Sequence, residues 1–189
     1  MSTATVTSQL ANGLSCALPA DSPLAKLLRS QRTWVGPSAN ERLKLLQGAK
    51  SVAIVGASPN SARASYFVGT YLLQSSKYRV YFVNPNADEI LGHKTYPDLA
   101  SLPEVPDIVD VFRKASDIPS VIDDVLAVGA PTIWVQLGIW NQDAAEYGES
   151  KGLNVVMDRC IKIEHARFNG GLYLLGFDTG VISARKTAR

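Results

Sequence analysis

The chain has 189 residues, of which 46% are hydrophobic and 19% charged, a composition typical of one globular domain with a short extension. The longest apolar stretch, Val125–Trp140, is interrupted by two glycines, a proline, a threonine and a glutamine, so a membrane-spanning helix is excluded. Two cysteines are too few for a disulfide framework or a four-cysteine zinc site, and they favour a reducing compartment. We therefore expect a cytoplasmic protein.

The net charge of +2 is unevenly distributed along the chain. Residues 1–50 carry +4 and residues 161–189 carry +3, whereas residues 51–160 carry −5. Proteins that bind nucleic acids usually present a basic face on the folded domain, because they must neutralise phosphates. The acidic central segment therefore argues against a nucleic-acid partner.

The N-terminal part is predicted to consist of a tail and a helical extension. Residues 1–20 are rich in Ser, Thr and Ala and contain no charged residue, which predicts a mobile tail. A mitochondrial targeting segment is the alternative, because the tail contains no acid. Residues 21–48 are predicted as helical; the second helix should begin after Ser38, which has capping-box spacing to Glu41, and end near Gly48.

Short β-branched runs then alternate with amphipathic stretches over residues 49–165. The runs end at Gly56, Val83, Phe112, Gln136 and Met157. The amphipathic stretches are Tyr66–Gln74, a short one at Asp98–Leu102, Ile118–Val128 and Asn141–Lys151. This alternation predicts an α/β fold, a doubly wound parallel sheet of five or more strands with helices on both faces. Residues 166–189 are predicted as a C-terminal arm that contains one further apolar stretch, Leu172–Phe177.

In a doubly wound sheet, ligands bind outside the carboxyl ends of the strands. The loop after the first predicted strand, from Gly56 to Ser65, is rich in small and hydroxyl-bearing residues and leads into a helix. Such a loop lets a phosphate approach backbone N–H groups and the positive end of a helix dipole. Arg63 in this loop and Arg113 after the third strand add two guanidinium groups at the same edge. We therefore predict a phosphate site there, the alternative being a plain strand-to-helix turn.

The pattern disfavours a nicotinamide dinucleotide as the ligand. The dinucleotide fingerprint requires Gly at the first, third and sixth loop positions, which here hold Gly56, Ser58 and Ser61. The second strand is followed by Asn84-Pro85 rather than by an acid that binds a ribose hydroxyl. The missing acid would suit a ribose that carries an extra phosphate, because a carboxylate would repel that phosphate.

Several short motifs follow the predicted strands in order. They are VGAS at Val55–Ser58, RASY at Arg63–Tyr66, VNP at Val83–Pro85, VDVFR at Val109–Arg113, QLG at Gln136–Gly138 and VVMDRC at Val155–Cys160. With them, residues 49–165 resemble the small, single-domain members of the CoA-binding protein family, whose fold is that of the N-terminal domain of the succinyl-CoA synthetase alpha subunit. The resemblance implies a Rossmann-like domain that binds coenzyme A or an acyl-CoA.

The resemblance also implies which residues contact the ligand. Phosphate would be held by Gly56, Ala57, Ser58, Asn60, Arg63 and Ser65. The nucleotide would contact Asn84 and Pro85, and the opposite side of the crevice would be formed by Phe112, Arg113, Gln136 and Gly138. Pro59, Ala62 and Arg63 stand where the synthetase loop is richer in glycine, so the diphosphate pose is expected to differ.

Ligase activity is not expected to carry over from the synthetase. The synthetase needs a second domain with a phosphorylated histidine, and too few residues follow His165 for such a domain. With His93 as the only other histidine, no Ser–His–Asp set can be assembled, and no metal cluster is apparent. The favoured function is CoA binding without catalysis, with a small-molecule ligand and no protein partner identified. The alternatives are an NAD(P)-dependent oxidoreductase, an acyl-transfer or thiol enzyme, and a regulatory CoA sensor.

Cys160 is the candidate reactive thiol. It follows the fifth predicted strand, and the neighbouring Arg159 and Lys162 are expected to lower its pKa. The alternative is a buried packing cysteine. Asp110, inside VDVF, is interpreted as a partly buried acid that pairs with Arg63 or Arg113.

Overall fold

The computed structural model describes residues 32–169, and the structural statements below refer to these residues. The chain divides into two units, residues 1–35 and Gly36–Arg189. Of the first unit only residues 32–35 are described, and they form neither helix nor strand. The predicted tail, the helix expected before Arg32, Cys16 and the apolar stretch Leu172–Phe177 all lie outside the described residues.

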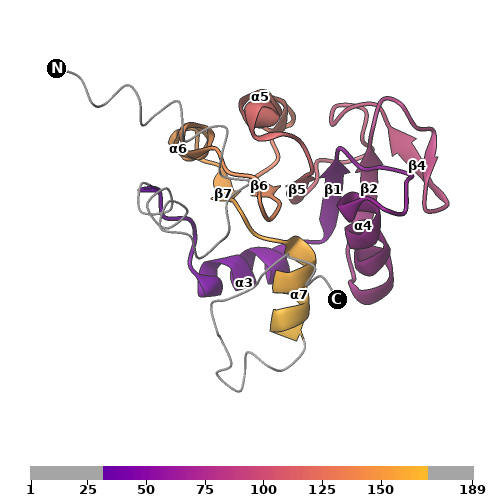
Figure 1. The fold of residues 1–189 in the computed structure, drawn as a ribbon, viewed down its shortest axis with the longest axis horizontal. Helices are drawn as coiled ribbons and strands as arrows, with labels where there is room; N and C mark the ends of the chain where they lie inside the picture. Colours follow the sequence, from indigo (N-terminus) through magenta and orange to yellow (C-terminus); the bar gives the residue numbers. More distant parts are fainter. Residues whose placement is uncertain (1–31, 170–189) are drawn as a thin grey trace, which may run out of the picture. The chain divides into compact units, whose positions relative to one another are not determined.

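A seven-stranded sheet forms the centre of the second unit (Figure 1). Its strands are β1 (Ser51–Val55), β2 (Arg79–Val83), β3 (Glu89–Ile90), β4 (His93–Tyr96), β5 (Ile108–Val111), β6 (Thr132–Val135) and β7 (Asn154–Val156). They lie in the order β3-β4-β2-β1-β5-β6-β7, and all neighbours are parallel except β3 and β4. Without β3, this is the strand order of a Rossmann fold, so the predicted fold class is confirmed.

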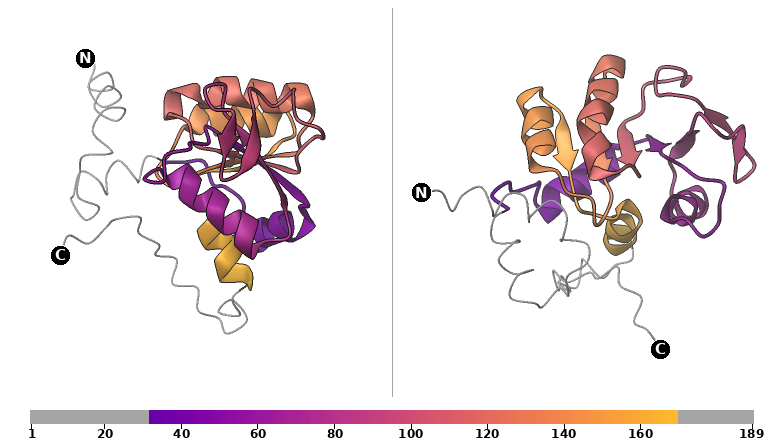
Figure 2. Two further views of the ribbon diagram at one scale, coloured as in Figure 1. Left: turned by 90° about the vertical axis from the view of Figure 1, so that its right-hand side faces the viewer. Right: turned by 45° about the horizontal axis from the view of Figure 1, so that its top comes forward.

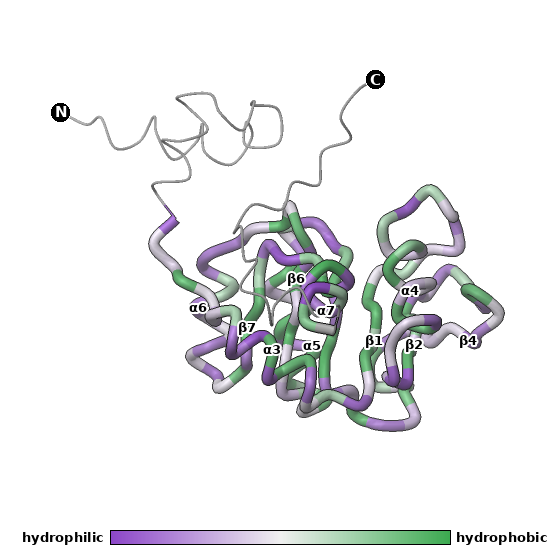
Figure 3. The backbone as a smooth tube through the Cα atoms, turned by 90° about the horizontal axis from the view of Figure 1, so that it is seen from below, coloured by the Kyte–Doolittle hydropathy of each residue, from purple (hydrophilic) through white to green (hydrophobic). Residues whose placement is uncertain are grey.

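The central strands are apolar because both of their faces are covered. All four residues of β5 and of β6 are buried, as are the first four of β1. Figure 3 shows hydrophobic residues along these strands. Strands covered on both faces read as continuous hydrophobic runs rather than as an alternating pattern. This is why the sequence marks them so clearly.

Helices cover both faces of the sheet. They are α3 (Ala39–Gly48), α4 (Ala64–Ser75), α5 (Ile118–Val128), α6 (Gln142–Ser150) and α7 (Ile161–Asn169), with a short 3-10 helix, η1 (Ala115–Asp117), before α5. Helices α5 and α6 lie on one face, and α3, α4 and α7 lie on the other (Figures 1 and 2). No helix among the described residues is long and apolar enough to cross a bilayer.

Helix α3 begins as its sequence predicts and belongs to the same unit as the sheet. The Ser38 hydroxyl accepts a hydrogen bond from the Glu41 amide, and the Glu41 carboxylate accepts one from the Ser38 amide at 2.7 Å, which confirms the capping box. Arg42 of α3 then forms a buried ion pair with Glu164 of α7 at 2.8 Å. Helix α7 therefore connects α3 to the domain, and it continues past the boundary predicted at residue 165.

The segment between β2 and β5 differs from the prediction. The stretch Asp98–Leu102 forms turns and bends instead of a helix, and the chain crosses to the edge of the sheet through β3 and β4. Strand β4 has the sequence HKTY, and only Thr95 is buried. A short strand with mostly exposed polar residues carries no apolar pattern, so the sequence did not reveal it.

Candidate ligand-binding cavity at the carboxyl edge of the sheet

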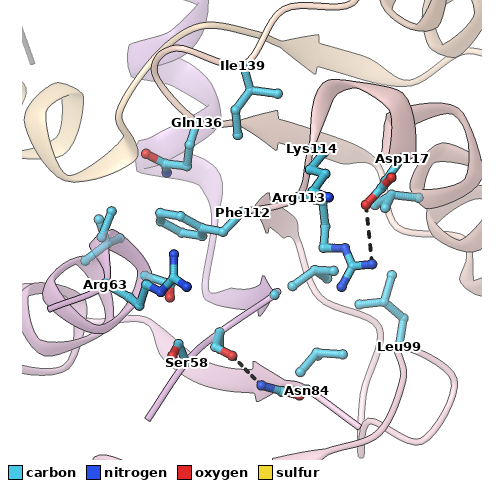
Figure 4. Close-up of a pocket in the computed structure, with 18 of the residues that line it drawn as sticks. Ser58, Arg63, Asn84, Leu99, Phe112, Arg113, Lys114, Asp117, Gln136 and Ile139 are labelled. Atoms are coloured by element: carbon cyan, nitrogen blue, oxygen red, sulfur yellow. Dashed lines mark hydrogen bonds and ion pairs between the residues drawn. The ribbon is translucent and has the colours of Figure 1, made fainter. Parts of the chain in front are cut away.

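The topology places a crevice between the ends of β1 and β5. The chain leaves β1 into α4 on one face, and it leaves β5 into α5 on the opposite face. At such a switch point two neighbouring loops separate and leave a space for a ligand. A cavity of about 1080 Å³ lies there, lined by residues that follow β1, β2, β5 and β6 (Figure 4).

Most of the residues implied by the family resemblance line this cavity. Ten of the twelve do so: Gly56, Ala57, Ser58, Arg63, Ser65, Asn84, Pro85, Phe112, Arg113 and Gln136. The candidate thiol Cys160 also lines it. Asn60 and Gly138 do not, and each has a structural partner described below. These residues therefore share one site, and their contact with a ligand stays a prediction.

Gly56 is required by the backbone at the end of β1. Its φ is +78°, a conformation that side chains disfavour, and a Cβ there would lie 2.6 Å from the carbonyl oxygen of Phe112. The Gly56 amide donates to the carbonyl oxygen of Val83. The glycine therefore lets the three loops after β1, β2 and β5 pack closely at the base of the cavity.

The loop between Gly56 and α4 is shaped by its own polar side chains. The Ser58 hydroxyl accepts a hydrogen bond from the Asn60 amide at 3.2 Å, and the Asn60 side-chain oxygen accepts one from the Ala62 amide at 2.9 Å. Asn60 therefore orders the turn that leads to Arg63, although it does not line the cavity.

The N-terminus of α4 opens on the cavity. Arg63 is its N-cap residue, and no side chain caps the helix or places an acid in its first turn. Arg63, Ala64 and Ser65 all line the cavity. Uncapped N–H groups at the start of a twelve-residue helix, beside a guanidinium group, favour an anion.

Asn84 links two of the loops. Its side-chain amide donates to the Ala57 carbonyl oxygen at 2.7 Å (Figure 4), and its side-chain oxygen accepts from the Asn86 amide at 2.8 Å. Both ends of the carboxamide are therefore used to position the loops after β1 and β2. An acid in the place of Asn84 could not donate to Ala57, so the departure from the nicotinamide pattern has a structural reason here.

Arg113 lies on the other side of the cavity, close to acids. Its guanidinium group forms an ion pair with Asp117 at 3.4 Å (Figure 4). Lys114 lies beside Arg113, and Asp98 and Asp124 also line the cavity. The charge on the Arg113 side is therefore mixed, whereas Arg63 forms no ion pair among residues 32–169.

Gln136 extends from the end of β6 and contacts Asp110 of β5. Its side-chain amide donates to one carboxyl oxygen of Asp110, which is completely buried. Burial raises the pKa of Asp110 to about 8, and the hydrogen bond from Gln136 lowers it by a smaller amount. The expected pairing of Asp110 with Arg63 or Arg113 is wrong. The register of the sheet places Asp110 between Ile54 of β1 and Trp134 of β6.

Gly138 has a structural role beside the cavity. Its φ is +88°, and its amide donates to a carboxyl oxygen of Asp158 at 2.7 Å. Asp158 itself has a φ of +57°. This contact connects the loops after β6 and β7, and it shows why both positions stand out in the sequence motifs.

Of its two basic neighbours, Lys162 lowers the pKa of the Cys160 thiol as expected, but burial outweighs this effect. Burial raises the pKa of this thiol overall, although the backbone at Ile163 and Lys162 lowers it, and the nearby Asp110 raises it further. The Lys162 ammonium lies 3.9 Å from the centre of the Phe67 ring, so it is mainly engaged with an aromatic face. Arg159 is exposed. Cys160 therefore faces the cavity as a protonated thiol near neutral pH.

Several residues that line the cavity belong to no sequence motif and were therefore not predicted. Leu99 comes from the turn region that was predicted as helix, and Ile163 comes from α7, which was not predicted. Ile139 and Lys114 lie next to predicted residues, and proximity in the chain was the only signal for them. No group of three or more His, Cys, Asp and Glu side chains among residues 32–169 could hold a metal ion.

The strand order and the cavity at the switch point define a Rossmann-type ligand-binding domain. Residues 50–166 match the family model described as CoA binding domain, and the chain belongs to this family. The structure is similar to that of a hypothetical protein from Pyrococcus horikoshii OT3, with 34% identity and a TM-score of 0.67 over 70% of this chain and 93% of that one.

Two curated proteins extend the comparison. The uncharacterized protein YneT of Bacillus subtilis (strain 168) is 38% identical over 130 residues, which cover 69% of this chain and 96% of YneT. The ADP-forming acetate–CoA ligase II of Archaeoglobus fulgidus is 33% identical over 81 residues, 42% of this chain but only 12% of the ligase. The similarity to the ligase is thus restricted to a small part of that enzyme.

Proposed function

We propose that the protein binds coenzyme A or an acyl-CoA in the cavity at the carboxyl edge of its sheet. The observation that carries the proposal is the uncapped N-terminus of α4, which opens with Arg63 on a cavity of about 1080 Å³ in a chain of the CoA binding domain family. The helix and Arg63 would hold the diphosphate. The cavity is at the upper end of the range for small-molecule sites, which suits a ligand as long as CoA.

The cavity suits CoA better than a nicotinamide dinucleotide. Asn84 stands where dinucleotide-binding domains use an acid for the ribose hydroxyls, and its carboxamide already bridges two loops. The loop also has Ser58 and Ser61 in place of two fingerprint glycines. Because Asn84 is neutral, it would not repel a phosphate on the ribose of the ligand, as a carboxylate would.

We propose that the ligand is bound without being transformed. Neither histidine lines the cavity, and the Cys160 thiol is disfavoured as a nucleophile because its pKa is raised. An acyl-transfer activity through Cys160 and an oxidoreductase activity are the alternatives. A binding domain of this kind would act in the cytoplasm, as a carrier or sensor of CoA.

The test is native mass spectrometry of the purified protein, followed by thermal unfolding with added ligands. A CoA species should co-purify, and CoA should raise the melting temperature more than equal concentrations of NAD or NADP, because only a ligand of the native state raises it. An equal or larger rise in melting temperature with NAD or NADP would favour the oxidoreductase hypothesis over CoA binding. No shift with CoA would exclude the proposal.

A further inference from the structure

The cavity has one wall without charged side chains. Arg63, Arg113 and Lys114 line other parts of it. The wall formed after β6 and at the start of α7 consists of Gln136, Leu137, Ile139, Cys160 and Ile163. In Figure 4, Gln136 and Ile139 lie across the cavity from Asn84 and Leu99, with Phe112 between them. CoA is divided in the same way, into a charged nucleotide half and an uncharged pantetheine arm that has two amides and a thiol.

Gln136 presents a hydrogen-bond acceptor on this uncharged wall. The residue is only 4% exposed, so its orientation is set by its contacts. Its side-chain nitrogen donates to Asp110, which directs the other end of the carboxamide away from Asp110. The Gln136 side-chain oxygen has no hydrogen-bond partner in the part of the chain that the structure describes, and it is not among the fully buried atoms. It is therefore available to a ligand donor.

Asp110 explains why Gln136 is held in this orientation. It is 0% exposed, and one of its carboxyl oxygens accepts from Gln136 while the other has no partner among residues 32–169. A buried carboxyl group with an unpaired oxygen destabilises a fold, so its presence calls for a reason beyond packing. Its one hydrogen bond within residues 32–169 is with a side chain of the cavity wall.

We propose that Gln136 binds the pantetheine arm of CoA through its side-chain oxygen, and that Asp110 is the residue that positions it. The proposal rests on the proposed function and assigns the uncharged wall to the uncharged half of the ligand. The donor is an amide N–H, the hydroxyl O–H or the thiol S–H of the arm. Cys160 and Ile163 border the same place. The nucleotide half lies against the α4 end and makes no contact with Gln136.

The first test measures binding to Gln136→Met by calorimetry, with CoA, desulfo-CoA and adenosine 3′-phosphate 5′-diphosphate, which is the nucleotide half alone. We expect Gln136→Met to bind CoA about three- to tenfold more weakly, the usual effect of one neutral hydrogen bond. Affinity for the nucleotide half should not change. Gln47→Met, an exposed position on α3 outside the cavity, is the matched control.

Desulfo-CoA identifies the donor. If the thiol donates to Gln136, the substitution will leave desulfo-CoA binding unchanged; if an amide or the hydroxyl donates, it will weaken desulfo-CoA and CoA alike. Either result supports contact with the arm. An equal loss for the nucleotide half, or no loss for CoA, overturns the proposal. If the wild-type protein binds neither CoA nor the nucleotide half, it is the proposed function that fails.

The second test separates positioning by Asp110 from a purely structural role. Asp110→Val removes the acceptor for Gln136 and should weaken CoA binding as much as Gln136→Met does, with the nucleotide half unaffected. Asp110→Asn keeps an acceptor oxygen and should bind CoA as the wild type does. The double variant Asp110→Val/Gln136→Met should be no weaker than Gln136→Met alone, since Asp110 acts through Gln136. Additive losses, or a failure of Asp110→Asn to restore binding, contradict the role. Asp110→Ala replaces the valine variant if that variant does not fold.

Discussion

Arg63 and Arg113 both line the cavity, but their surroundings differ. Arg63 is exposed at the N-cap of α4 and forms no ion pair among the described residues, so its charge adds to that of the helix dipole. Arg113 is paired with Asp117, and a phosphate would have to compete with that carboxylate. The two arginines, which look equivalent in the sequence, therefore make unequal contributions to an anion site.

We predict that Arg63→Ala weakens CoA binding by about tenfold to a hundredfold, the range for a lost hydrogen bond to a charged group. Arg113→Ala should weaken it less, because the wild-type arginine is already neutralised by Asp117. Isothermal titration calorimetry measures both. Arg79→Ala, which removes an arginine that is paired with Glu104 and does not line the cavity, corrects for the change in net charge. A larger loss for Arg113→Ala would place the phosphates on the α5 side.

Asp110 should also make the stability of the protein depend on pH. Burial raises its pKa to about 8 in the folded state, whereas an unfolded aspartate titrates at 3.8. Between these values the unfolded chain loses a proton that the folded chain retains, so the free energy of unfolding falls as pH rises. The slope from this one group is at most about 1.4 kcal/mol per pH unit.

We predict that Asp110→Asn removes this component and is increasingly more stable than the wild type as pH rises from about 5 to 8. Urea unfolding of both proteins at each pH measures the difference. His165, whose pKa is lowered by burial, is present in both proteins, so its contribution cancels. A difference that is independent of pH would show that Asp110 is ionised in the folded protein, as an exposed aspartate is.

At the scale of elements, α3 and α7 are joined by a buried ionic cluster. Glu164 of α7 accepts from Arg42 of α3 at 2.8 Å and lies 3.3 Å from Arg167 in its own helix. Its side chain is 2% exposed and that of Arg42 10%. Because α7 also supplies Ile163 to the cavity, this cluster connects α3 to an element that lines the site.

Loss of the carboxylate of this cluster should reduce the free energy of unfolding more than loss of the Arg42 guanidinium group. Glu164→Leu leaves the buried Arg42 without its carboxylate and should reduce the free energy of unfolding by about 3–5 kcal/mol. Arg42→Met should cost less, because Glu164 retains Arg167. Denaturant unfolding compares the two variants, with Lys44→Met on the exposed side of α3 as the control. An equal or larger cost for Arg42→Met would mean that Arg167 does not stabilise Glu164.

Elements were predictable from the sequence where local chemistry alone defines them. The capping box at Ser38 and Glu41 marked the start of α3, and the fully covered strands β1, β5 and β6 appeared as apolar runs. Strand β4 and helix α7 were not predicted. In β4 only Thr95 is buried. Helix α7 has a mostly polar sequence and buries the charged Glu164 against Arg42 of α3. Neither element therefore has the hydrophobic periodicity by which an element is recognised in a sequence.

At the scale of the whole molecule, the sequence by itself determined the parallel α/β architecture and the edge at which a ligand would bind. Both follow from strand–helix alternation, because crossovers in parallel sheets have one hand and ligands bind at the carboxyl ends. Ten of the twelve residues predicted from the sequence line one cavity, because each of them follows the end of a strand.

Only the tertiary structure decided which partners these residues have and therefore which role each of them can take. The contact between Gln136 and Asp110 depends on the pairing of β5 with β6, two strands that the sequence identifies without showing which side chains meet. The engagement of Arg113 by Asp117, the bridging of two loops by Asn84 and the raised pKa of Cys160 likewise depend on distance and burial. Residue type and spacing define what a side chain can do, whereas its neighbours in space determine its charge state, its free hydrogen-bonding groups and therefore its role.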